Sequence, residues 1–202
     1  MRWSGSASSD MKYSSVCCIA DASIHPYLSG LKLSSWARAM EKSMLKIVNG
    51  DLLDSDCQYI THQCNCYSRR GAGLASAIFK AFPWADVYSN RSECGVDASL
   101  FGSITVHGNP KRNRRYVINI DGQLKPGKPS LGRDSAASRL EAFGKAIDQI
   151  AELPELKSIG FPYGIGCGLA GGDWNKYGRL LEDFAERVGE RGVSVILYRL
   201  GQ

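Results

Sequence analysis

The chain has 202 residues, of which 44% are hydrophobic and 22% are charged, and it carries a formal net charge of +5 at pH 7. This length favours one domain with an extension over two full domains. The composition excludes a largely disordered chain, because ordinary folded proteins have similar proportions of apolar and charged residues. The small positive charge suits an anionic ligand at least as well as a nucleic acid.

The seven cysteines are odd in number, and their spacing does not resemble a disulfide framework. The N-terminal region has no apolar run long enough for a signal peptide, and no stretch of the chain approaches the length of a membrane span. We therefore expect a cytoplasmic or nuclear protein in a reducing compartment, with no membrane partner.

Residues 1–44 differ from the rest of the chain. The stretch 4–9 is small and polar, 17–20 is briefly apolar, and 34–44 has the pattern of one amphipathic helix. No residues there indicate chemistry. We interpret 1–44 as an N-terminal extension, either poorly ordered or a docking segment, and we assign 45–202 to the folded domain.

From residue 45 onward, the hydrophobic pattern alternates between strands and helices. Strands are predicted at 45–48 and 58–65, followed by a helix that opens at 71–73 and is stopped by Pro83. The next two strands follow this helix along the chain.

These strands, at 103–107 and 116–120, flank the basic run Lys111–Arg115. We interpret the run as a solvated hairpin loop, and the alternative is a nucleic-acid patch. A helix at 136–150 has its leucine, phenylalanine and isoleucine side chains on one stripe.

The C-terminal part repeats the alternation. A strand is predicted at 158–161, a helix begins at Asp173 and Trp174, and 193–200 is the last strand. Strands that alternate with helices imply a mainly parallel sheet covered on both faces.

Ligands in such folds bind beyond the carboxyl ends of the strands, and three loops of this chain occupy that position. The first loop, residues 49–52, contains Asp51 directly after a strand. Its carboxylate can accept a hydrogen bond from an exocyclic amine such as that of adenine, or it can cap the next turn. Both roles stay open.

The second loop, residues 64–74, carries Gly71 and Gly73 before the predicted helix. Glycines at a helix N-terminus let backbone N–H groups approach a phosphate, whose charge the helix dipole favours. Asn65 offers donors and an acceptor for sugar hydroxyls. The alternative is a plain tight turn in which the glycines adopt positive φ.

The third loop, residues 161–174, has five glycines between Gly164 and Gly172. Ordering so much backbone freedom is costly, and a simple connection needs only about two to six residues. A loop that cradles a ligand accounts for the excess glycine. At its end, Asp173 is a helix N-cap, a general base or a ribose ligand, and geometry must decide among these roles.

Together the three loops resemble the macrodomain family. The resemblance rests on Gly50–Asp51, on Gln63–Cys66 with Gly71–Leu74, and on Ile165–Leu169 followed by Trp174. It covers about residues 45–200, and it is closest to the branch that contains the terminal ADP-ribose protein glycohydrolase and the ADP-ribose-1''-phosphate phosphatases. It implies a three-layer α/β/α fold with a mixed, mostly parallel sheet.

The resemblance also implies ligand contacts, position by position. Asp51 would bind the adenine amino group, Leu52 would supply backbone contacts, and Tyr198 would stack on adenine, with a core or sheet-edge role for Tyr198 as the alternative. The distal ribose and one side of the diphosphate would contact Asn65, Gly71, Ala72, Gly73 and Leu74. The other side of the diphosphate would contact Gly164, Ile165, Gly166, Cys167, Gly168 and Leu169.

The chain departs from the glycohydrolase branch at two positions. That branch attacks with a lysine at the end of a middle strand, where this chain reads Asn119–Gln123, helped by an aspartate where this chain has Ala170. A covalent lysyl mechanism is therefore not expected. We expect water to attack the distal ribose or its phosphate, with Asp173 as the general base, Asn65 orienting the ribose, and Asp121 as a weaker catalytic candidate.

Four residues in or beside the loops are not expected to carry metal or thiol chemistry. His62, beside the second loop, is interpreted as a structural histidine. Cys64, Cys66 and Cys167 lie in the ligand loops, but they lack a fourth ligand and the usual zinc spacing. No histidine is clearly placed to activate a thiol. We expect no metal, no cofactor and no catalytic thiol.

The function expected from the sequence is hydrolysis of an ADP-ribose derivative, either an adduct on a protein or nucleic-acid base or ADP-ribose-1''-phosphate. One alternative is a reader module that binds ADP-ribose without turnover, and another is a general nucleic-acid binder that uses the basic run. The expected partner is ADP-ribose or an ADP-ribosylated macromolecule. Nucleic acid enters only as such a substrate, and we expect a monomer.

Overall fold

The computed structural model describes residues 45–91 and 97–201. The predicted extension, including the helix expected at 34–44, lies outside the described residues. From residue 45 onward, strands and helices follow one another in the predicted order, with short 3-10 turns between several of them.

Six strands of the described chain form one sheet in the order β1-β6-β5-β2-β4-β3. Their bounds are β1 (Leu45–Asn49), β2 (Tyr59–Asn65), β3 (Ile104–Asn109), β4 (Arg114–Gln123), β5 (Ser158–Pro162) and β6 (Ser194–Arg199). Neighbouring strands are parallel except β3 and β4, which form an antiparallel hairpin. The prediction of a mixed, mostly parallel sheet is confirmed.

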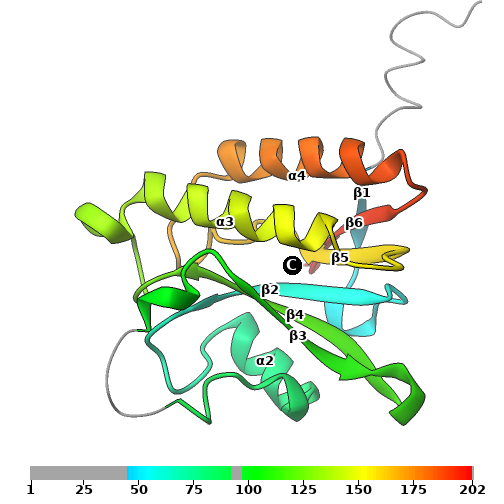
Figure 1. Cartoon of the computed structure of the whole chain (residues 1–202), viewed down its shortest axis with the longest axis horizontal. Helices are drawn as coiled ribbons and strands as arrows, with labels where there is room; N and C mark the ends of the chain where they lie inside the picture. The colour runs from blue at the N-terminus through cyan, green and yellow to red at the C-terminus, as the bar shows by residue number, and fades with distance from the viewer. Residues whose placement is uncertain (1–44, 92–96, 202) are drawn as a thin grey trace, which may run out of the picture.

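Helices cover both faces of this sheet (Figure 1). They are α2 (Leu74–Ala81), α3 (Ala136–Ala151) and α4 (Trp174–Gly189). α3 and α4 lie together on one face, and α2 lies on the other. The predicted three-layer α/β/α architecture is therefore confirmed. Among the described helices, none is long and apolar enough to cross a membrane.

Two cores fill the spaces between the layers. Beneath α3 and α4, the rings of Phe161 and Phe184 meet edge to face with centroids 5.8 Å apart. Beneath α2, Ile60 of β2 shares a core with Ile78 of the helix. Successive strand residues point to opposite faces, so Tyr59 and Ile60 enter different cores. Burying one such side chain contributes roughly 1.5–3 kcal/mol.

β4 runs farther than its hydrophobic pattern predicts. The sequence predicts a strand over 116–120, but β4 continues through Asp121 to Gln123. Pairing with β2 extends it, because Gln123 lies opposite Asn65 after a bulge at Gly122. The extension places a polar strand end beside the second loop.

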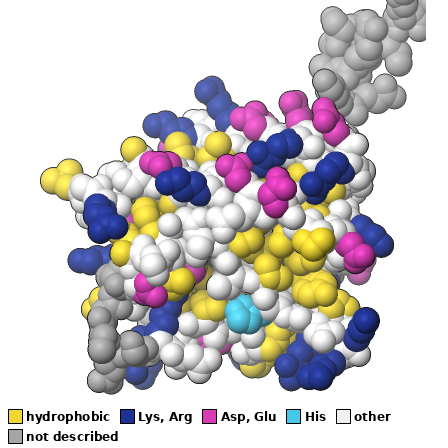
Figure 2. Space-filling model, viewed as in Figure 1, with side chains coloured by type: hydrophobic (Ala, Val, Ile, Leu, Met, Phe, Trp, Pro, Cys, Tyr) yellow, Lys and Arg dark blue, Asp and Glu magenta, His cyan; other side chains and the backbone are white. Residues whose placement is uncertain are grey.

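The basic run lies in the β3–β4 hairpin, as predicted, where a 3-10 turn spans Pro110–Arg112. This hairpin precedes β4, so it lies at the opposite end of the strand from the carboxyl ends of β2 and β4. Figure 2 shows basic side chains gathered near the hairpin and charges of both signs over α3 and α4. The basic run is therefore remote from the expected ligand loops.

Candidate ligand-binding site

A cavity of about 380 Å³ opens at the carboxyl ends of the parallel strands. The ends of β2, β4 and β5 supply Asn65, Gln123 and Pro162 to its wall. The second loop (64–74) and the third loop (161–174) supply most of the remaining wall. The two glycine-rich stretches thus converge on one hollow, at the position where such sheets bind ligands.

Most residues that the resemblance assigns to the ribose and diphosphate line this cavity. They are Asn65, Ala72, Gly73, Leu74, Gly164, Ile165, Gly166, Gly168 and Leu169. Gly71 and Cys167 are chain neighbours of lining residues. Besides these two, five predicted site residues lie outside the lining, namely Asp51, Leu52, Asp121, Asp173 and Tyr198.

The third loop keeps its shape mainly through its own backbone, with one hydrogen bond from the side chain of Arg139 to the carbonyl of Ala170 at 3.1 Å. Gly164 and Gly166 have φ values of +76° and +74°, in the region that favours glycine. The N–H of Cys167 donates to the carbonyl of Gly164, and that of Gly172 donates to the carbonyl of Gly166, both at 2.9 Å. A Cβ on Gly166 would lie 2.5 Å from the ring of Tyr177, so the loop has no room for a side chain there.

The second loop enters α2 through Gly73, whose φ is +55°. α3 and α4 begin with side-chain caps from Ser135 and Asp173, but the N-cap of α2 makes no such hydrogen bond. The first N–H groups of α2 therefore lie at the cavity wall without a side-chain acceptor, where an anion can accept from them. Leu169 of the third loop reaches to 3.4 Å from the Cβ position of Gly73, so the two loops nearly meet.

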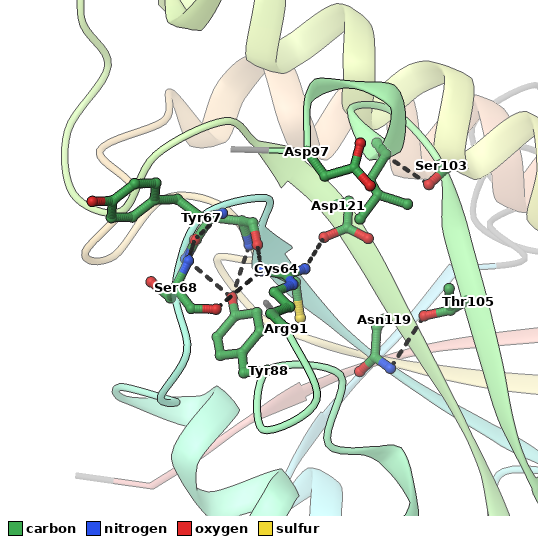
Figure 3. A network of polar contacts seen from close by, with 12 residues as sticks. Cys64, Tyr67, Ser68, Tyr88, Arg91, Asp97, Ser103, Thr105, Asn119 and Asp121 are labelled. Atoms are coloured by element: carbon green, nitrogen blue, oxygen red, sulfur yellow. Dashed lines mark hydrogen bonds and ion pairs between the residues drawn. The ribbon is translucent and has the colours of Figure 1, made fainter. Parts of the chain in front are cut away.

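Asn65 is fixed by hydrogen bonds with Tyr67, Ser68 and Tyr88, three residues that Figure 3 labels. Its Oδ1 accepts from the N–H groups of Tyr67 and Ser68 at 3.0 and 2.6 Å, which closes a turn. Its Nδ2 donates to the hydroxyl of Tyr88 at 3.0 Å, and its backbone N–H donates to the same oxygen at 2.8 Å. An amide nitrogen carries two hydrogens, so one remains for a ligand.

The cavity wall favours an anionic ligand. Within the described chain, no aspartate or glutamate lines it, and Arg70 supplies positive charge. His62 also lines the cavity, but burial lowers its pKa to about 4, so the ring is neutral near pH 7. Its Nε2 lies 2.5 Å from Oδ1 of Asn119. His62 is a buried structural residue, as predicted.

Asp173 does not reach the cavity. Its carboxylate accepts from the N–H of Asn175 at 3.0 Å and caps α4. The side chain is exposed and lies on a separate groove between α3 and α4. Of the three roles open to Asp173 from the sequence, the structure shows the helix cap, and the other two stay predictions. The expected general base is therefore not placed to act on a ligand in the cavity.

Asp121 lies behind the cavity wall. It lies near the carboxyl end of β4 with 1% of its surface exposed, and it forms an ion pair with Arg91 at 3.1 Å. Burial raises its pKa to about 6; Arg91 acts in the opposite direction, and the negative charge of Asp97 adds to the rise. Asp121 faces Arg91 and is absent from the lining, so the geometry favours a structural position, and its catalytic role stays a prediction.

The residues expected to bind adenine lie beside the cavity, near the ends of β1, β5 and β6. Asp51 accepts from a backbone N–H two residues ahead at 2.9 Å and caps a 3-10 turn, while Leu52 is buried. Tyr198 of β6 pairs with the lining residue Pro162 of β5. Its hydroxyl lies 3.7 Å from Sγ of Cys57. The adenine contacts stay a prediction.

Sequence reasoning missed three residues at the site. Gln63 lines the cavity, and both polar atoms of its amide are buried without a hydrogen-bond partner in the described structure. Its Oε1 lies 2.7 Å from the Cβ position of Gly166 and 2.9 Å from that of Gly122, so two glycines make room for the amide. Gln63 belongs to the Gln63–Cys66 motif on which the resemblance rests. The motif could have pointed to Gln63, but it did not indicate what the side chain does. Tyr88 and Arg91 follow a turn with no recognisable pattern.

The cysteines of the two loops are free thiols. Cys64 and Cys66 are buried, and burial raises the pKa of both. Cys167 is half-buried, and burial raises its pKa to about 11. Across residues 45–91 and 97–201, no group of three or more His, Cys, Asp or Glu side chains could hold a metal ion.

A family model described as Macro domain matches residues 61–181 of the chain. The match begins in β2 and ends in α4, so it includes the second and third loops and the cavity between them. The chain belongs to the Macro domain family. The assignment of this macrodomain to the glycohydrolase and phosphatase branch stays a prediction.

Similar proteins include a phage protein and several proteins of known structure. An uncharacterized 17.5 kDa protein of Enterobacteria phage T4 is 26% identical over 149 residues, which cover 72% of this chain and 92% of the phage protein. The macrodomain of Mycobacterium tuberculosis DarG is 19% identical with a TM-score of 0.52, covering 77% of this chain and 97% of that one.

Two further solved structures contain ADP-ribose. The Trypanosoma brucei macrodomain in complex with ADP-ribose is 17% identical with a TM-score of 0.54, covering 79% of this chain and 64% of that one. Thermosipho africanus DarTG in complex with ADP-ribose is 21% identical with a TM-score of 0.56, covering 77% of this chain and 41% of that one. At these identities, the likenesses establish the shared fold.

Proposed function

We propose that this macrodomain binds ADP-ribose or a derivative of it, with the diphosphate between the second and third loops. The observation that carries the proposal is the convergence of two glycine-rich loops on one cavity that no described carboxylate lines. Backbone N–H groups at a helix N-terminus suit a phosphate. The ADP-ribose in the solved structures from Trypanosoma brucei and Thermosipho africanus supports the same ligand here.

In this proposal, the ligand runs across the ends of the parallel strands. The diphosphate lies between Gly73 and Gly166, and the distal ribose faces the remaining amide hydrogen of Asn65. The adenine extends toward Asp51 and Tyr198. A carboxylate can accept several hydrogen bonds, so the cap that Asp51 makes is compatible with a contact to the adenine amine.

Gly168 offers a sharp test of the loop assignment. It lines the cavity, and a Cβ on it would meet no protein atom within 4 Å. Gly168→Phe should fill the cavity without clashing with the protein, and we expect ADP-ribose affinity to fall at least about tenfold. Isothermal titration calorimetry measures this. Gly201→Phe, which also enters open space but outside the cavity lining, is the matched control.

The wild-type protein should bind ADP-ribose saturably and more tightly than AMP. Unchanged affinity in Gly168→Phe would contradict the placement of the diphosphate. If the protein instead bound nucleic acid with an affinity that falls steeply with salt and depends on Lys111–Arg115, the nucleic-acid binder would replace the proposal.

Gln63 favours a second function, hydrolysis of a bound ADP-ribose derivative by water. An amide donates through its nitrogen and accepts through its oxygen, and both atoms of Gln63 are buried and unpaired at the cavity wall. Such atoms cost free energy unless they find partners, and a small rotation of the amide toward the cavity would let one water molecule pair with both. Gln63 and Asn65 come from the same strand, so this water would share a wall with the group that faces the ribose.

The test of hydrolysis is a turnover panel with ADP-ribosylated protein, ADP-ribosylated DNA and ADP-ribose-1''-phosphate. Gln63→Met keeps the length of the side chain and removes the amide. We expect it to slow release about 10²-fold, the loss typical when one positioned hydrogen-bonding group is removed, with a smaller change in ADP-ribose affinity. A wild-type protein that binds ADP-ribose and releases nothing from any of the three substrates is a reader module.

A further inference from the structure

Arg91 connects the second loop to a charged group behind the cavity (Figure 3). Its guanidinium donates to the carbonyl oxygens of Asn65 and Ser68, the latter at 3.2 Å. It also pairs with Asp121 at 3.1 Å and lies over the ring of Tyr88, 4.5 Å from the centroid. One side chain thus joins the second loop, the segment after α2 and the end of β4.

The two carbonyls that Arg91 binds belong to the 65–68 turn, which carries two cavity-lining side chains, Asn65 and Ser68. Removing the guanidinium would leave both carbonyls without this donor in a largely buried place, which costs free energy. The planar fork of arginine can serve the carbonyls and a carboxylate together. The point charge of lysine cannot reproduce that geometry.

Asp121 gives the guanidinium its orientation. Its carboxylate is almost fully buried, and a buried carboxylate without a partner is strongly unfavourable. The ion pair therefore keeps Arg91 directed toward the end of β4 while its Nη1 reaches the turn. The conformation of the cavity wall depends in this way on a charge that the ligand does not touch.

We propose that Arg91, oriented by Asp121, is a positioning residue that sets the 65–68 turn for ligand binding. The inference rests on the proposed function, because ADP-ribose affinity is its first readout. It adds that the second loop is competent to bind only while the ion pair behind it is formed.

Protonation of Asp121 should then weaken ligand binding. Burial raises the pKa of Asp121 to about 6, Arg91 opposes this, and Asp97 adds to it. The thiols of Cys64 and Cys66 also face Asp121, but burial raises their pKa values, so they stay neutral over this range. Below about pH 6, the ion pair becomes a weaker hydrogen bond to a neutral acid, and the turn loosens.

Arg91→Lys separates geometry from charge. We expect Arg91→Lys and Arg91→Met to lower ADP-ribose affinity alike, at least about tenfold, because neither can bridge the two carbonyls and Asp121. Recovery of binding in Arg91→Lys would show that only the charge matters and would overturn the inference. Arg187→Met removes an exposed ion pair with Asp148 and is the matched control. Unfolding curves establish that each variant is folded.

The wild-type protein supplies a second test. Its ADP-ribose affinity should fall as the pH is lowered, with a midpoint near 6, and Asp121→Asn should remove this pH dependence. In the ligand-free protein, the NMR signals of the Asn65 side-chain amide should shift with the same midpoint, because they report the turn directly.

These measurements distinguish the two ways of failing. If the wild-type protein does not bind ADP-ribose but the Asn65 signals titrate, the proposed function is overturned and the positioning of the turn is supported. If ADP-ribose binds with a flat pH profile and Arg91→Lys binds like the wild-type protein, the positioning role is overturned and the proposed function stands.

Discussion

The two walls of the cavity are built in different ways. The third loop is held mainly by its own backbone, through glycines at positive φ and the hydrogen bond from Gly172 to Gly166, and Arg139 adds one side-chain hydrogen bond to the carbonyl of Ala170. The second loop is held by side chains from outside it, those of Tyr88 and Arg91, with Asp121 behind them. One wall is encoded largely in a continuous stretch of sequence, and the other depends mainly on distant residues and on a charge.

This difference determines what should disturb each wall. A loop held by its backbone should fail when one of its own glycines gains a side chain. A loop held by remote side chains should fail when those residues change or when the pH changes. Substitutions inside and outside the loops can therefore test whether the two walls are independent.

The largest effect is expected at Gly166. Gly166→Ala would place a Cβ 2.5 Å from the ring of Tyr177 at a φ of +74°. Overpacking and backbone strain together should lower the free energy of unfolding by roughly 2–4 kcal/mol, measured by urea denaturation. Gly164→Ala has a similar φ and open space, so strain alone should cost roughly 1–2 kcal/mol. Equal losses would contradict the packing argument.

Tyr88→Phe tests the other wall. It removes the hydroxyl that accepts from both the backbone N–H and Nδ2 of Asn65. Leaving these buried donors unpaired should cost roughly 1–3 kcal/mol of stability, and ADP-ribose affinity should fall with it. Tyr116→Phe is the control, because Tyr116 stacks on Tyr59 through its ring. Wild-type affinity in Tyr88→Phe would argue against a wall held by side chains.

The ion pair behind the second loop should also give stability a pH dependence. Asp121 has a native pKa of about 6, raised from its ordinary value of 3.8, so the native state binds the proton more tightly than the unfolded state. Its stabilising contribution is therefore complete below the unfolded pKa and is lost as the pH rises through the native one.

Relative to Asp121→Asn, we expect the wild-type protein to lose on the order of 1–2 kcal/mol between pH 4 and pH 7. Denaturation of both proteins across that range measures the difference. Acid should thus stabilise the fold while it loosens the turn. A difference between the two proteins that does not change with pH would contradict the native pKa of Asp121.

The smallest effect is expected at Asp173. Asp173→Ala removes the cap of α4 and should cost about 1 kcal/mol, whereas Asp173→Asn keeps a capping oxygen. Neither variant should change ADP-ribose affinity or turnover, because the carboxylate lies outside the cavity. A loss of turnover of about 10²-fold or more in both variants would restore Asp173 as the general base.

The sequence predicts the fold and the third loop because both are local. The helix at 136–150 shows its apolar stripe within one continuous segment, and α3 spans the same residues to within one position. The glycine content of residues 164–172 likewise predicts a loop with unusual φ values, and three of its glycines have positive φ. Hydrophobic period and glycine content report such features directly.

The second wall could not be predicted in this way. Its contacts join Arg91 to residues 23 to 30 positions away, and no periodicity marks such pairs. The polar end of β4 was not predicted as strand because Asp121 and Gln123 break the apolar pattern, although pairing with β2 continues through these residues. Asp173 suits a cap and a catalytic base equally well by residue type, so only its position could separate the two roles.

The cysteines of the two loops are buried to different extents, so they can serve as chemical probes of this macrodomain. Cys167 is half-buried on one loop of the cavity, while Cys64 and Cys66 are buried behind the opposite one. A thiol-alkylating reagent needs access to the sulfur and a thiolate, so Cys167 should be modified before Cys64 and Cys66 in the folded protein. Labelling mapped residue by residue can then report the accessibility of the third loop at Cys167 and any opening behind the second loop at the buried pair.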